Sequence, residues 1–157
     1  MSFQIIGIPY EPFAPLFALS DAELAARRAL RVVATEARGF PCRVSLVDAA
    51  IGEELLLLPF EHQPARSPYH ATGPIFVRRA ARPAIVEPGV IPACVRGRLM
   101  SVRAYDSADL MIETAVCDGD DAAAVLTSQL ANPAVSYIHL HNARPGCFSC
   151  AVQRVRG

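Results

Sequence analysis

Residues 137–150, YIHLHNARPGCFSC, have the pattern of two strands joined by a tight turn. The first arm alternates apolar and polar side chains, and the Pro-Gly pair that follows it favours a turn. The second arm continues to residue 155 as CFSCAVQRV, which alternates again. Because side chains along a strand point to opposite faces in turn, His139 and His141 share one face. This stretch therefore predicts an antiparallel hairpin that carries two histidines beside two cysteines.

Similar patterns outside this hairpin predict the rest of the sheet. Alternating or isoleucine-rich stretches bounded by turn residues are typical of strands. We expect strands at 3–8, 43–47, 53–60, 74–79, 99–105 and 110–117, with hairpins formed by 43–47 with 53–60 and by 99–105 with 110–117. The proline-rich segment 81–92 predicts an irregular surface connection, because proline cannot donate a backbone hydrogen bond.

Two helices interrupt the strands. Ser20 and Glu23 have the spacing of a capping box, which predicts a helix start at this point. The stretch 118–133, DGDDAAAVLTSQLANP, has acidic residues where a helix begins, helix formers inside, and an Asn-Pro stop. The sequence therefore predicts a single α+β domain over 1–157, with a mainly antiparallel sheet built from hairpins and two helices.

Composition narrows the classes of function. The 15 basic residues are all arginine, and they balance 15 acidic residues. This balance disfavours a nucleic-acid partner. No segment approaches the roughly 20 apolar residues of a membrane helix, and the first residues lack the basic region of a secretion signal. We therefore expect a cytoplasmic protein of 157 residues that does not enter a membrane. The oligomeric state is left open.

The five cysteines are predicted to be free thiols, because an odd number without a secretion signal does not suggest a disulfide framework. They are Cys42, Cys94, Cys117, Cys147 and Cys150. The last two lie three residues apart in a predicted strand, which separates their Cα atoms by roughly 10 Å. A disulfide requires less than about 7 Å. Cys147 and Cys150 should therefore not be bonded to each other.

The C-terminal hairpin is also a candidate metal site. In a regular register one of the two cysteines must share the histidine face, and its position beside the turn favours Cys147. His139, His141 and Cys147 would form a three-ligand set for zinc or another divalent transition metal. A fourth ligand could come from preceding loops. The candidates there are His62, His70 and Asp48.

Three other interpretations compete with a metal. Cys147 and His141 could be the nucleophile and base of a thiol-dependent hydrolase or transferase, with Asn142 or Asp48 orienting the histidine. The histidines could instead be half-buried residues with satisfied nitrogens, or the chain could be a non-enzymatic interaction module. A small-molecule pocket is a further possibility. Its candidate residues are Arg43, Asp48, His62, Tyr69 and Asn142. Whether the protein is an enzyme is left open.

Three stretches together resemble a known family. They are PCRVSLVDAAIGEELLLLPFEHQPARSPY, IFVRR and YIHLHNARPGCF. The chain is similar in them to a bacterial family of single-domain proteins, the domain of unknown function 1203. The resemblance extends from FAPLFALSDAEL to the last strand and includes the HxHN and PGC elements, whereas Cys150 is not part of the pattern. It implies no activity, because the family is uncharacterised.

Overall fold

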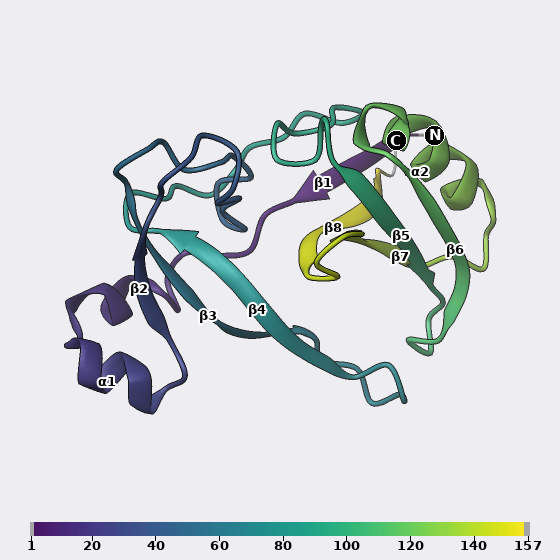
Figure 1. Cartoon of the computed structure of the whole chain (residues 1–157). Coiled ribbons are helices and arrows are strands. Elements are labelled where there is room, and N and C mark those ends of the chain that lie inside the picture. Colours follow the sequence, from purple (N-terminus) through teal and green to yellow (C-terminus); the bar gives the residue numbers. More distant parts are fainter. Residues whose placement is uncertain (1, 156–157) are drawn as a thin grey trace.

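A computed structural model describes residues 2–155 as two antiparallel sheets and two helices (Figure 1). The five-stranded sheet has the order β1 (Ser2–Ile6), β8 (Phe148–Val155), β7 (Tyr137–Asn142), β5 (Leu99–Tyr105) and β6 (Met111–Asp118). The three-stranded sheet has the order β2 (Leu30–Val33), β3 (Glu54–Gln63) and β4 (Ala71–Arg78). The helices are α1 (Asp21–Ala26) and α2 (Ala122–Ala131), with short 3-10 turns η1 (Ala14–Ala18) and η2 (Gly119–Asp121). The predicted α+β fold with mainly antiparallel sheets is confirmed.

Several predicted elements appear where their local signals place them. The Ser20 hydroxyl accepts from the Glu23 backbone at 3.2 Å, and the Glu23 carboxylate accepts from the Ser20 backbone at 2.7 Å. This reciprocal pair is the predicted capping box of α1. Strands β5 and β6 pair as a hairpin, as do β7 and β8. The segment 81–92 contains no helix or strand.

The predicted hairpin between 43–47 and 53–60 is wrong. Strand β3 pairs instead with β2 and β4, while residues 41–48 form a looped turn in which Leu46 adopts a φ of 55°. Val44 is buried in the core beside α1, whereas Leu46 is buried in the core of the five-stranded sheet. The apolar alternation at these positions therefore comes from a loop that reaches two cores, which imitates the pattern of a strand.

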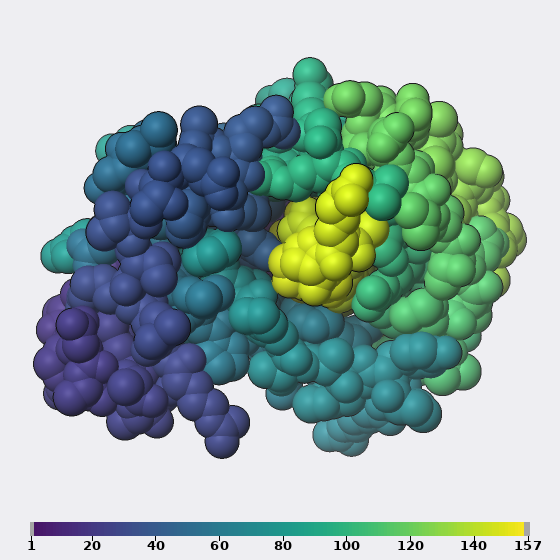
Figure 2. All heavy atoms as spheres, in the orientation of Figure 1, coloured from purple at the N-terminus to yellow at the C-terminus, as the bar shows by residue number. Residues whose placement is uncertain are grey.

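The two faces of β7 contact different parts of the molecule. Ile138 and Leu140 pack with Leu126 of α2 in the largest core. The opposite face of β7 lies toward β3, where Phe60 of β3 contacts Phe148 of β8 at 6.2 Å between ring centroids. In Figure 2 the C-terminal residues, coloured yellow, lie between the blue N-terminal part and the green part of the chain. Gln63 of β3 also donates its Nε2 to the Tyr137 hydroxyl of β7 at 3.0 Å, so side chains of β3 and β7 meet between the sheets.

Strand β3 is covered on both faces, as its run of four leucines predicts. Leu55, Leu56 and Leu58 are buried, and Leu57 is partly buried.

Within residues 2–155 no helix is long and apolar enough to cross a membrane.

Candidate metal centre

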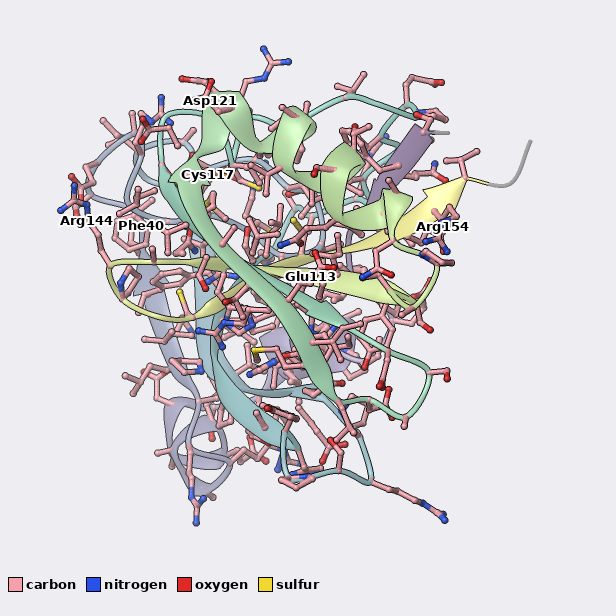
Figure 3. The ribbon with its side chains drawn as sticks, turned by 90° about the vertical axis from the view of Figure 1, so that its right-hand side faces the viewer. Phe40, Glu113, Cys117, Asp121, Arg144 and Arg154 are labelled. Carbon is pink, nitrogen blue, oxygen red and sulfur yellow. The ribbon has the colours of Figure 1, made fainter. Side chains whose placement is uncertain are left out.

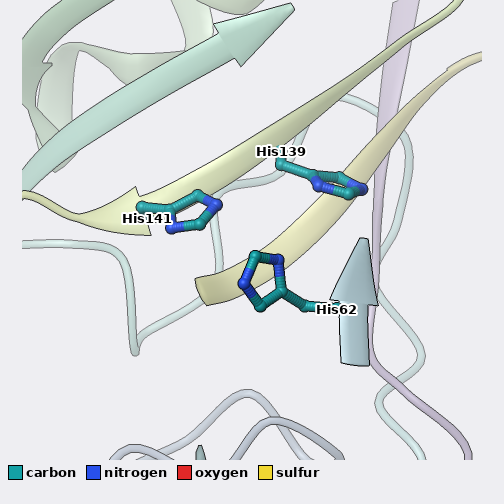
Figure 4. Close-up of side chains that lie close together, drawn as sticks. All are labelled: His62, His139 and His141. Carbon is teal, nitrogen blue, oxygen red and sulfur yellow. The ribbon is translucent and has the colours of Figure 1, made fainter. Parts of the chain in front are cut away.

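Three histidines from two strands converge between the sheets (Figure 4). His139 and His141 project from the same face of β7, as strand alternation predicts, and His62 reaches them from β3. Each ring offers one nitrogen that lies within 4.8 Å of the nitrogens offered by the other two. We call these three residues the histidine cluster. It brings together side chains separated by almost 80 positions in the sequence.

Each member of the histidine cluster has a buried ring nitrogen without a hydrogen-bond partner among the described residues. These atoms are Nδ1 of His62, Nδ1 of His139 and Nε2 of His141. The other nitrogen of His141 lies 3.1 Å from the Gly146 carbonyl oxygen. This contact places the proton on Nδ1 and leaves Nε2 with a free lone pair, which is how a backbone carbonyl prepares a metal-binding histidine. Buried polar atoms usually have partners, so three unpaired atoms in one place require an explanation.

Aromatic rings surround the cluster and restrict the access of water. The Phe148 ring stacks on His62 with an interplanar angle of 7° and a centroid distance of 5.3 Å. Tyr105 and Tyr137 each lie 5.3 Å from His139 by the same measure. His139 and His141 are 6% and 1% exposed, while His62 is partly exposed. The cluster therefore has aromatic walls, and His62 is its most exposed member.

Burial keeps these imidazoles neutral at physiological pH. It lowers the pKa of His139 to about 4, with further contributions from His141 and His62. Burial likewise lowers the pKa of His141 to about 4, although its hydrogen bond to Gly146 opposes the change. The pKa of His62 is also lowered, mainly by burial and then by the positive charge of Arg103. Neutral imidazole is the form that binds metals.

Cys147 lies outside the histidine cluster. Its sulfur is 3.0 Å from Nη2 of Arg43 and 3.5 Å from Nδ2 of Asn142. A β-bulge between β7 and β8 places Cys147 there. His141 pairs with Phe148, whereas its neighbour Leu140 pairs with Cys150. Ser149 is the extra residue, and the parity argument for the cysteines assumed a regular register. Phe148 therefore occupies the position beside the histidines that the sequence suggested for a cysteine.

All five cysteines are free, and the prediction that Cys147 and Cys150 are not bonded is confirmed. Cys150 is fully buried in the large core with Leu140. No hydrogen bond joins Cys147 to His141 among residues 2–155. The predicted thiol therefore contacts Arg43 and Asn142 rather than the predicted base.

The other predicted pocket residues are divided among three places. Arg43 and Asn142 line a cavity together with Cys147. Asp48 forms a two-pronged ion pair with Arg98, at 2.6 and 3.1 Å, and Arg98 lines the same cavity. Tyr69 lies apart from them, with its ring edge-on to Tyr105 at 6.1 Å. His62 is in the histidine cluster.

Arg103 is the neighbour of the histidine cluster that sequence reasoning missed. It pairs with His139 across β5 and β7, and its charge contributes to the lowered pKa of each clustered histidine. No carboxylate within 4.0 Å pairs with it among the described residues. The alternation of SVRAY in β5 is the signal that could have placed this side chain, once β5 was known to neighbour β7.

The fold and the site define an α+β protein with a three-histidine cluster between two antiparallel sheets. The chain belongs to the family described as "Protein of unknown function (DUF1203)", whose family model matches residues 39–154. This match covers all three clustered histidines and the strands that carry them. No curated protein and no solved structure matches the chain.

Proposed function

We propose that the protein binds a divalent transition metal through His62, His139 and His141. The observation that carries this proposal is the convergence of three neutral imidazoles, each with a buried ring nitrogen that has no partner among the described residues. Three histidines and an open fourth position are the ligand set of many catalytic zinc sites. Ligand nitrogens in a tetrahedral zinc site lie roughly 3.3 Å apart, as bonds of about 2.0–2.1 Å require. The offered nitrogens lie within 4.8 Å of one another, so the three side chains would have to draw together to bind zinc in this geometry.

The surroundings favour an anionic fourth ligand. Three neutral histidines leave the positive charge of the metal unbalanced, and Arg103 adds a second positive charge nearby. A hydroxide or the carboxylate of a small molecule would offset part of this positive charge. His62 is the partly exposed member of the cluster, so such a ligand would approach from its side. Metal binding with an exchangeable anionic ligand is therefore the function that the site supports best.

Zinc is expected to stabilise the chelator-stripped protein against thermal unfolding. A ligand that binds only the folded state contributes about 2.7 kcal/mol at a free concentration of 100 times Kd. For a domain of this size, the melting temperature would rise by roughly 5–10 °C. His141→Ala should remove this gain, because it deletes the ligand that Gly146 orients. His62→Gln should reduce the zinc-induced rise in melting temperature, because it removes the ligand that the three-stranded sheet contributes. Glutamine fills the same space, so this variant leaves no cavity.

His70→Ala is the matched control. His70 is exposed and contacts Glu61 at 3.1 Å, away from the histidine cluster. It is the fourth histidine of the chain, so its removal tests whether zinc binds imidazole without regard to position. The control should keep the full zinc shift. Equal shifts in wild type and all three variants, or no shift in wild type, would reject the proposed site.

The thiol-dependent alternative has weaker support. A cysteine nucleophile requires a base within hydrogen-bond reach, whereas the sulfur of Cys147 contacts Arg43 and Asn142. The ring of His141 is committed to Gly146 on one side and faces the histidine cluster on the other.

A further inference from the structure

Arg43 is a buried cation without an anionic partner. It is 2% exposed, and no carboxylate of residues 2–155 lies within 4.0 Å of its guanidinium. Its Nε donates to the Phe148 carbonyl at 2.7 Å, its Nη1 to the Pro41 carbonyl at 2.5 Å, and its Nη2 to the sulfur of Cys147 at 3.0 Å. Buried charges in proteins are normally paired, because leaving water is costly. The positive charge of Arg43 therefore lacks its expected counterpart.

A cavity of about 450 Å³ adjoins this guanidinium. Four arginines line it, from the 38–43 loop, the 97–99 segment and the β7–β8 turn. They are Arg38, Arg43, Arg98 and Arg144. Among the lining residues Asp118 alone is acidic. Asp48, which does not line the cavity, forms the ion pair that neutralises Arg98. We call this cavity the arginine pocket. It keeps an excess of positive charge after the ion pair is counted.

The arginine pocket is open to solvent. Figure 2 shows the surface hollowed where the blue N-terminal loop meets the yellow C-terminal turn. In Figure 3 Arg144 projects from the β7–β8 turn beside the loop that carries Phe40, whose neighbours Gly39 and Pro41 line the pocket. Arg144 is exposed, so its guanidinium is free to contact a ligand at the entrance. A small molecule could thus reach the buried Arg43 from the turn.

Two buried side chains in the lining have unused hydrogen-bonding capacity. A guanidinium has five N–H donors, and the three contacts of Arg43 leave two of them without a partner among the described residues. Asn142 is 6% exposed, and its Oδ1 has no partner there either. Arginine forks match the paired oxygens of carboxylate and phosphate groups. The two unused donors of Arg43 and the missing negative charge thus point to the same kind of ligand, while the Asn142 Oδ1 can accept only from a protonated group of that ligand.

We propose that the arginine pocket binds an anionic small molecule through its carboxylate or phosphate group, with Arg43 holding the oxyanion at the base and Arg144 at the entrance. The volume is in the range of small-molecule sites. The ligand would lie beside the sulfur of Cys147, which also lines the pocket. This site is separate from the histidine cluster, since strand alternation directs Asn142 away from the face that carries His141.

Alkylation of Cys147 by iodoacetamide reports occupancy of the pocket. The reagent is uncharged, so it does not itself compete as an anion. We would measure the rate at Cys147 by mass spectrometry, with an uncharged chelator present, in sodium phosphate, sodium succinate and sodium chloride of equal ionic strength. At ten times its Kd an anion leaves about one tenth of the pockets free, so alkylation should slow about tenfold. Cys117 is partly exposed and does not line the pocket, so its rate should not change.

Arg144→Ala is the test variant, because Arg43 holds three groups of the fold while Arg144 lies on an exposed turn. Loss of one charged contact should weaken protection about three- to tenfold in apparent Kd. Arg66→Ala removes an exposed arginine outside the pocket and should leave protection unchanged. Protection by phosphate alone or by succinate alone would identify the oxyanion class. Protection by neither anion, or equal protection of Arg144→Ala and wild type, would overturn the proposal. Since the chelator removes any metal, these outcomes do not depend on the zinc result.

Discussion

Metal-free protein is expected to lose roughly 4 kcal/mol of its unfolding free energy when the pH falls from 7 to 5. The cause is the pKa of His139 and His141, which burial lowers from about 6.5 in the unfolded chain to about 4 in the fold. Between these values the unfolded state binds more protons than the folded state. The contribution of these two neutral histidines to stability is therefore fully present above pH 6.5, and it is lost as the pH falls toward 4. Urea unfolding at several pH values in a chelating buffer measures this loss.

Removing the titrating groups should flatten the acid dependence. In the double variant His139→Gln with His141→Gln, neither side chain takes up a proton, so most of the loss between pH 7 and pH 5 should disappear. The part that remains is due to His62, whose pKa is also lowered by burial. The exposed His70 offers the control, because His70→Gln should keep the wild-type slope. A wild-type protein equally stable at both pH values would show that the two clustered histidines are solvated in solution.

Replacing Gly119 by alanine is expected to cost about 3 kcal/mol or more of stability. A Cβ atom at this position would lie 1.9 Å from the carbonyl oxygen of Val95 and 2.7 Å from its carbon. The obstacle is backbone, so no side-chain rotation relieves it. The Gly119 amide also donates to the Arg98 carbonyl at 2.7 Å, which fixes the junction between β6 and α2 against the 95–98 segment. Urea unfolding at neutral pH measures the change.

Gly52→Ala provides the comparison for this variant. Gly52 has a φ of +91°, and a Cβ atom there would meet nothing within 4 Å. Its replacement adds backbone strain of about 1–2 kcal/mol without a clash. The loss at Gly119 should exceed the loss at Gly52. If the two variants were equally stable, the β6–α2 junction would have to move away from Val95 at little cost.

Local signals in the sequence were sufficient for those elements that depend on neighbouring residues. The capping box of α1 and the hairpin from Leu99 to Asp118 follow from side chains a few positions apart. Strand β2 was not predicted, because its four residues, LRVV, follow the predicted helix without a turn signal of their own. The false strand at 43–47 arose because burial in two different cores produces the same alternation as burial in one sheet.

The candidate metal centre was predicted in part. Strand alternation placed His139 and His141 on one face, while His62 appeared as an optional fourth ligand and as a candidate for the small-molecule pocket. Its position follows from the packing of β3 against β7, which depends on contacts far apart in the sequence. The arginine pocket was harder to predict, because Arg43 and Arg144 line the same cavity only when the 38–43 loop lies beside the β7–β8 turn.

The bulge at Ser149 determines whether a cysteine sulfur joins the imidazole nitrogens of the proposed metal centre. If β7 and β8 paired regularly from His141 and Phe148 onward, His139 would lie opposite Cys150, and a thiolate would join the two imidazoles. Such a set prefers softer metals and is inactivated when oxidants convert the sulfur to sulfenic or sulfinic acid. With one extra residue in the strand, the cysteine turns into the core and the cluster consists of nitrogen ligands alone. A single inserted residue thus makes the proposed centre tolerant of oxidising conditions.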